Sequence, residues 1–172
     1  LEDGVSATGA SEIVATLPTI GMAWGTDGNA FADIAYQYFG NRTGETPVID
    51  KVGKPCQQNY VIVISDGHIR NSTEAFRTLA KLRDEYEVTT LMVGYGGSYQ
   101  NANAKVIFDR LARAGSCESP GDYYANVNPI SYEGLDNKTG CESPIDAETP
   151  ADLKTEISSK IRQIIACLLY TS

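Results

Sequence analysis

The sequence is poor in the side chains that build structural metal centres. Of 172 residues, one is histidine and four are cysteines, and no two cysteines form a Cys-x-x-Cys pair. A structural zinc site needs four such ligands at short spacings, so this shortage argues against one. Long apolar runs are also missing, since none approaches the ~20 residues that a membrane-spanning helix requires. No secretory signal peptide is recognisable either. We therefore expect no membrane span.

Basic residues are in the minority. Lysine and arginine number 14 against 22 aspartates and glutamates, which gives a net charge of −8. An acidic surface repels polynucleotides, so nucleic acid is excluded as a partner. Hydrophobic residues make up 42% and charged residues 21%, the composition of an ordinary globular domain. Because the first residue is Leu1 and not methionine, we expect a piece cut from a longer precursor.

One apolar stretch, residues 59–65, is predicted to organise the fold. Val61 to Ile64 are consecutive β-branched residues, typical of a strand buried on both faces at the centre of a mostly parallel sheet. Ser65-Asp66-Gly67 follows directly. Open α/β sheets place their ligands at the carboxyl ends of such strands. This edge is therefore the first place to look for a site.

Helical and strand patterns alternate along the chain. Apolar spacing and cap residues predict helices at about 29–39, 71–86 and 104–112 with Gly115 closing the third, strands at 59–65, 88–93 and 123–125, a loop at 127–148, and a last helix from Pro150. This alternation predicts an α/β fold with three layers, a doubly wound, mostly parallel sheet between helices, as in Rossmann-like proteins.

Two cysteines occur in the same short sequence. Cys117 and Cys141 each begin Cys-Glu-Ser-Pro and bracket a polar, turn-rich segment. A disulfide between them would hold a loop with little core of its own, and it would indicate an oxidising compartment. The alternative is a pair of free thiols in a cytosolic protein.

The two ends of the chain are weakly patterned. Residues 1–28 are dominated by small and polar side chains, so we interpret them as a weakly structured lead-in to a domain at 29–166. Residues 167–172 follow a finished amphipathic helix without a stop signal. We interpret them as a non-native tail, the alternative being a frayed helix end.

Three features of the sequence carry a resemblance. They are the apolar strand that ends in Ser-Asp-Gly and is followed by a helix and a second strand ending in Val-Gly-Tyr-Gly, the helix just upstream at 29–39, and Tyr-Tyr-Ala-Asn followed after a loop by a helix that begins Pro-Ala-Asp-Leu-Lys. Together they resemble a von Willebrand factor type A domain, and two blocks carry a closer resemblance to one family of such domains. The blocks are Ala-Tyr-Gln-Tyr-Phe-Gly40 and, after a variable loop, Pro55-Cys-Gln-Gln-Asn-Tyr-Val-Ile-Val-Ile-Ser-Asp-Gly67. With a cysteine just before the apolar strand, these blocks are most similar to the type A domain of the PilY/PilC family of type IV pilus tip adhesins and biogenesis factors. The resemblance covers roughly residues 29–166.

The resemblance implies a metal-ion-dependent adhesion site built from three loops. Asp66 matches the aspartate of the third loop, and the threonine of the second is expected at Asn29, with Thr26 as the alternative. The Asp-x-Ser-x-Ser motif of the first loop is absent, which implies an N-terminally truncated domain. Mg²⁺ or Mn²⁺ would then bind weakly. From the residues alone, the alternative is that Asp66 acts as an N-cap and turn former before the next helix.

The function implied by this resemblance is adhesion without catalysis. The expected partners are a protein or surface receptor and pilus components such as minor pilins. The expected location is the fimbrium at the cell surface, or the extracellular or periplasmic space. Two other classes stay open. One is a metal-dependent hydrolase or phosphotransferase that uses Asp66, and the other is a structural scaffold whose metal site has decayed.

Overall fold

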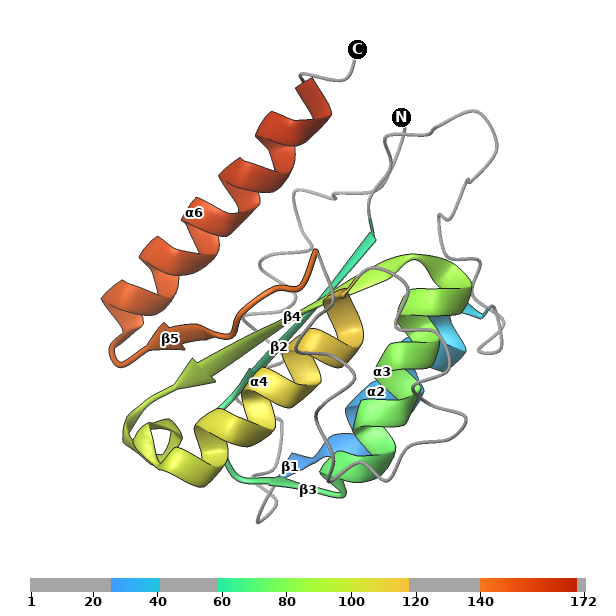
Figure 1. Ribbon diagram of the computed structural model, residues 1–172. Helices are drawn as coiled ribbons and strands as arrows, with labels where there is room; N and C mark the ends of the chain where they lie inside the picture. Colours follow the sequence, from blue (N-terminus) through green and yellow to red (C-terminus); the bar gives the residue numbers. More distant parts are fainter. Residues whose placement is uncertain (1–25, 41–58, 118–139, 170–172) are drawn as a thin grey trace, which may run out of the picture.

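The protein combines helices with parallel strands, which is an α/β fold (Figure 1). The computed structural model describes residues 26–40, 59–117 and 140–169. The expected strand at 123–125 lies outside these residues, as do most of the lead-in and residues 170–172. Residues 167–169 continue the last helix.

Three parallel strands form the larger sheet, in the order β2-β4-β5. They are β2 (Asn59–Ser65), β4 (Val88–Tyr95) and β5 (Ile145–Ala147). The central position expected for β2 is wrong within the described residues, because β4 occupies it and β2 lies at one end. Burial of β2 on both faces is also wrong. Val63 is 8% exposed, whereas Ile62 and Ile64 on the other face are 41% and 50% exposed.

Two very short strands form a second parallel pair beyond the end of β2. They are β1 (Thr26–Asp27) and β3 (Ile69–Arg70), with Thr26 opposite Ile69 and Asp27 opposite Arg70. The sequence did not predict them, since two residues carry no readable periodicity. They connect the start of one helix with the chain that leaves β2.

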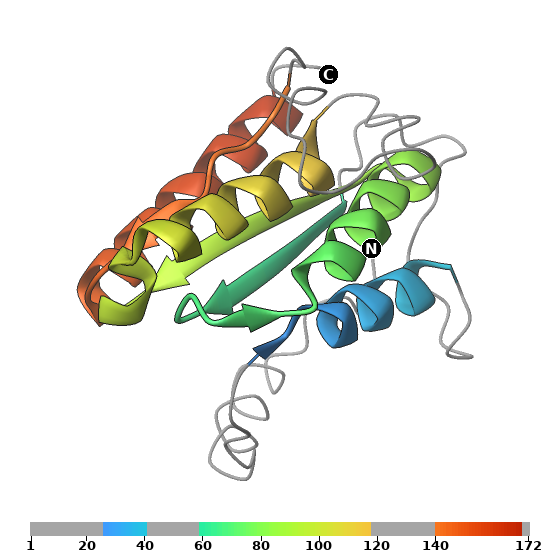
Figure 2. The ribbon, with the colours of Figure 1, turned by 60° about the horizontal axis from the view of Figure 1, so that its bottom comes forward.

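Helices α2 (Gly28–Phe39), α3 (Ser72–Tyr86) and α4 (Ala102–Ser116) lie side by side, as Figure 2 shows. Helices α3 and α4 contact β4, and α2 packs on α3 at the other side. The apolar residues of α2 are not all turned inward, because Ile34 is 67% exposed while Tyr36 is buried. The hydroxyl of Tyr36 donates to Glu85 Oε2 on α3 at 2.5 Å, which turns this face inward.

Glycines set two close approaches beside β4. Gly115 was expected to close α4, but it lies inside the helix, and Cys117 is the C-cap residue. A Cβ added to Gly115 would lie 2.4 Å from Thr90 Cβ, so glycine lets α4 reach the sheet. Gly94 has the same role, since its Cβ would lie 2.3 Å from the ring of Tyr99 in the 3₁₀ turn η2 (Gly97–Gln100).

The C-terminal helix α6 (Pro150–Leu169) runs along β5 at the edge of the sheet (Figures 1 and 2). Its predicted start is confirmed. Asp152 N donates to Thr149 Oγ1 at 3.2 Å, and Thr149 N donates to Asp152 Oδ2 at 3.0 Å. The loop expected at 127–148 is wrong at its end, because β5 lies within it. Among the described residues, no helix is long and apolar enough to cross a membrane.

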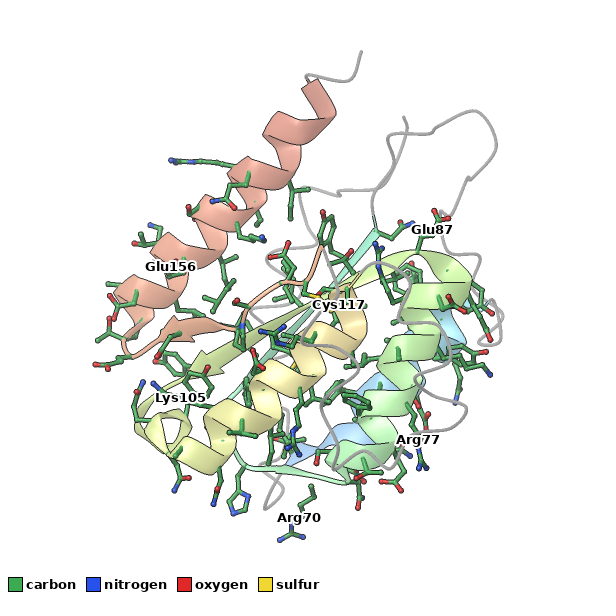
Figure 3. All side chains as sticks on the ribbon, viewed as in Figure 1. Arg70, Arg77, Glu87, Lys105, Cys117 and Glu156 are labelled. Atoms are coloured by element: carbon green, nitrogen blue, oxygen red, sulfur yellow. A yellow bond between two sulfur atoms is a disulfide. The ribbon has the colours of Figure 1, made fainter. Side chains whose placement is uncertain are left out.

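A disulfide joins Cys117 and Cys141, the pair expected from the sequence. Figure 3 labels Cys117 at the end of α4, where the side chain is fully buried. Nearby, Glu142 N donates to Ser116 Oγ at 2.7 Å, and Lys160 on α6 pairs with Glu142 at 2.5 Å. The bridge and these bonds connect α4 to the segment that carries β5 and α6.

Candidate cation site

Two hydroxyl groups meet at the carboxyl end of β2. Thr26 Oγ1 lies 3.2 Å from Ser65 Oγ, although 39 positions separate the two residues. The β1–β3 pairing brings Thr26 there, since Thr26 N donates to the carbonyl of His68 at 3.2 Å. Ser65 is 8% exposed, so its hydroxyl is positioned within the protein and not by solvent.

Asp66 follows Ser65 and forms the turn that leads into β3. Its Oδ1 accepts a hydrogen bond from His68 N at 3.3 Å, and the carboxylate is exposed. The next residue, Gly67, has φ of 106°, which a side chain rarely tolerates. A Cβ on Gly67 would lie 2.9 Å from Tyr99 Cα, so the turn is packed against η2. The turn-forming role expected as an alternative is therefore present.

Tyr99 packs against this turn. The side chain is 4% exposed and its ring lies 4.8 Å from that of Phe108. Burial raises the pKa of the Tyr99 hydroxyl above its usual value, and the charges of Asp146 and Asp109 raise it further. Tyr99 thus acts as packing for the loop, without a charge of its own.

Asn29 and Thr26, the two options for the second loop, differ in what they contact. The side-chain amide of Asn29 donates from Nδ2 to Asp33 Oδ2 at 3.0 Å, along α2. Thr26 instead contacts Ser65, directly before Asp66. Of the predicted site residues, Thr26 and Asp66 are thus brought to one edge, and the contact recorded for the Asn29 side chain lies within α2.

Asp27 and Asn71 also belong to this edge, and the sequence analysis missed their roles. Asp27 Oδ1 accepts from Asn29 N at 3.0 Å and from Asn71 Nδ2 at 3.2 Å. The first of these bonds caps α2, and the sequence signal for it was an aspartate directly before a helix. The helix predicted to begin at residue 71 starts at Ser72, and the preceding Asn71 makes no side-chain cap bond to it. Figure 3 shows Arg70 at this end, pointing away from the helices.

The oxygen atoms gathered here suit a hard cation in part. Mg²⁺ and Mn²⁺ prefer carboxylate, hydroxyl and water oxygens, and this edge offers two hydroxyls and the Asp66 carboxylate. Within the described ranges, no group of three or more histidine, cysteine, aspartate or glutamate side chains is placed to hold a metal. The residues therefore fit a partial, weakly charged shell.

The fold and this edge define an α/β protein whose polar residues gather at the carboxyl ends of parallel strands. Comparisons of the chain with protein-family models, with curated proteins and with solved structures found no match.

Proposed function

We propose that this chain is a non-enzymatic binding module with a metal-ion-dependent adhesion site at the end of β2. The observation that carries the proposal is the contact of Thr26 Oγ1 with Ser65 Oγ, 3.2 Å apart and directly before Asp66. It supports the resemblance to type A domains of the PilY/PilC pilus family, in which a threonine and an aspartate come from separate loops. The proposed architecture is the three-layer, doubly wound fold.

In this proposal Asp66, Thr26 and Ser65 hold Mg²⁺ or Mn²⁺. When bound, the cation supplies a Lewis-acidic centre for a carboxylate of the partner. The chain contributes one negative charge and two neutral hydroxyls, so one of the two positive charges of the cation stays unneutralised. That residual charge favours an anionic partner group. The exposed position of Asp66 leaves the edge open to a protein partner.

The proposed partners are a protein or surface receptor and pilus components such as minor pilins. The Cys117–Cys141 bridge supports an oxidising compartment, at the cell surface or in the extracellular or periplasmic space. With its acidic net charge of −8, the chain is proposed to meet proteins and not nucleic acid.

A structural scaffold with a decayed site is the second candidate, and one observation favours it. Asp66 Oδ1 already accepts the His68 amide, and the Asn29 amide already donates to Asp33. Side chains committed to local bonds are typical of turn and helix formers. In that case Asp66 would shape the β2–β3 turn and bind no ion.

Calorimetric titration with Mn²⁺ separates these candidates. We expect the wild-type chain to bind with a dissociation constant on the order of 1 mM, as open extracellular cation sites do. Asp66→Ala is expected to abolish binding. The matched control is Glu156→Ala, which removes an exposed carboxylate from α6 and should leave binding unchanged. Equal heats for wild type and Asp66→Ala would leave only the scaffold. Phosphate-ester turnover that Asp66→Ala abolishes would instead support a metal-dependent hydrolase.

A further inference from the structure

Asn71 holds an unusual backbone conformation at the start of α3. Its φ is 52° and its ψ 33°, in the left-handed region, which few residues other than glycine adopt and which asparagine adopts more often than most. Asparagine at a helix N-cap normally accepts a hydrogen bond from its own helix. Asn71 makes no such bond, so α3 begins without a side-chain cap. Because the Asn71 side chain makes no bond to its own helix, it can bond to another element, and a residue in this backbone conformation needs such support from the surrounding structure.

The Asn71 side chain reaches Asp27, 44 positions earlier in the sequence. Nδ2 donates to Asp27 Oδ1 at 3.2 Å, and the same oxygen accepts from Asn29 N at 3.0 Å. One carboxylate oxygen therefore joins the first turns of α2 and α3. We call this pair, Asp27 and Asn71, the Asp27–Asn71 latch.

The latch lies next to the residues that present the site oxygens. Asp27 is opposite Arg70 in the β1–β3 ladder, and the adjacent pair is Thr26 with Ile69. This ladder has only two residues per strand, and a backbone bond from Thr26 N to the His68 carbonyl lies at its other end. So short a ladder has few bonds of its own to fix Thr26. The Asp27–Asn71 latch adds a side-chain bond directly beside this ladder.

We propose that Asp27 and Asn71 are positioning residues that hold the Thr26 hydroxyl beside Ser65 and Asp66. The proposal rests on the function proposed above, because it assigns the latch to the affinity of that same cation site. Neither residue is assigned as a ligand. Both act through the placement of β1 against β3.

A charge swap tests the latch in the full chain. Asn71→Asp sets two carboxylates against each other, and we expect about tenfold weaker Mn²⁺ binding, a typical coupling for residues in contact. Asp27→Asn keeps an acceptor for both donors, so it should weaken Mn²⁺ binding less than Asn71→Asp does. The double variant Asp27→Asn/Asn71→Asp restores a donor–acceptor pair and should recover the affinity. A merely structural loss would not be rescued in this way.

Asn71→Gly guards against a variant that fails to fold. Glycine adopts positive φ without strain, so thermal unfolding without metal should be unchanged or improved while Mn²⁺ binding weakens by about tenfold. Wild-type affinity in both Asn71→Asp and Asn71→Gly would overturn the proposal. So would a double variant as weak as Asn71→Asp.

Hydrogen exchange of the Thr26 amide, measured without metal, separates the latch from the cation site. We expect faster exchange in Asn71→Asp and Asn71→Gly and wild-type protection in the double variant. If the wild type binds no Mn²⁺ while this exchange pattern holds, the proposed function fails and the positioning of Thr26 stands. Unchanged Thr26 exchange in all variants would overturn the latch itself.

Discussion

At the scale of single residues, the buried hydroxyl of Thr90 is expected to destabilise the protein. Its side chain is fully buried, and within the described part of the chain Oγ1 has no hydrogen-bond partner. A buried hydroxyl without a partner costs about 1–3 kcal/mol, and valine has the same shape. We expect Thr90→Val to raise the free energy of unfolding by about 1 kcal/mol, measured as a higher urea midpoint.

The matched control for this change is Thr90→Ser. It keeps the hydroxyl and removes the methyl group that packs in the core, so it should destabilise by about 1 kcal/mol. A valine variant less stable than the wild type would show that the Thr90 hydroxyl has a partner. The close approach of Gly115 to Thr90 predicts that Gly115→Ala lowers the stability of the protein, since the added Cβ would lie 2.5 Å from Thr90 Oγ1.

Ionisation of Tyr36 is expected to lower the stability of the protein at alkaline pH. Burial raises the pKa of its hydroxyl, and the hydrogen bond to Glu85 raises it further. A raised folded-state pKa contributes stability that is complete below the unfolded value of about 10 and is lost as pH rises through the folded value. Tyr36→Phe should therefore cost about 1 kcal/mol at pH 7 and show a smaller loss of stability above pH 10.

Denaturant titrations at neutral and alkaline pH measure this difference. Tyr38→Phe is the control, because Tyr38 lies on the same helix and is 37% exposed. It should follow the wild type at every pH. If Tyr36→Phe and the wild type lose stability in parallel above pH 10, Tyr36 does not carry the alkaline dependence.

At the scale of elements, the sequence predicted long patterns and missed short ones. Helices α2 and α3 and strands β2 and β4 follow from apolar periodicity, with ends correct within a few residues. Strand β5 has three residues, and β1 and β3 have two each, which is too few for a pattern. Apolar spacing alone does not indicate that Tyr36 of α2 faces inward, where its hydroxyl donates to Glu85 on α3. Periodicity in one segment cannot report a partner in another.

In the candidate site, only Ser65 and Asp66 carried a local signal in the sequence, and Thr26 entered as an alternative implied by the family resemblance. An aspartate after an apolar strand is a local signal. The contact between Thr26 and Ser65 spans 39 positions, and that between Asp27 and Asn71 spans 44. Both depend on the pairing of two strands that the sequence did not reveal. The disulfide was predictable because both cysteines repeat the same four residues.

The Cys117–Cys141 bridge is expected to fasten the element pair β5 and α6. Helix α6 packs mainly on β5, and β5 pairs with β4 over three residues. Replacing both cysteines by serine opens a loop whose ends are 24 positions apart. The expected cost is about 3 kcal/mol of unfolding free energy. Hydrogen exchange should show β5 and α6 losing protection before β2 and β4.

Lys160→Gln is the comparison for that double serine variant. It removes the ion pair with Glu142 but leaves the bridge, and a partly exposed pair contributes less than about 1 kcal/mol. Its exchange pattern should stay close to that of the wild type. Uniform loss of protection across the sheet in the serine variant would contradict a local role for the bridge.

At the scale of the whole molecule, β2 lies at one end of the sheet formed by the described strands, and it lacks the usual protection of an edge strand. Its seven residues carry no charge, and in the described sheet it has a neighbour on one side only. Natural edge strands are commonly guarded by lysine, proline or a bulge. Two copies of the chain repel each other through the net charge of −8 that each carries. We expect this electrostatic repulsion to be weakest at the uncharged β2 edge.

We therefore expect the protein to self-associate through β2 at high concentration, and Ile64→Thr to weaken this. Ile64 is 50% exposed, and threonine keeps the strand propensity while removing apolar surface. Sedimentation velocity across a concentration series measures the effect. Ile34→Thr makes the same chemical change on α2, where the side chain is 67% exposed but no strand edge is present. Association weakened equally by both changes would point to general hydrophobicity, whereas an effect confined to Ile64→Thr identifies the edge of β2.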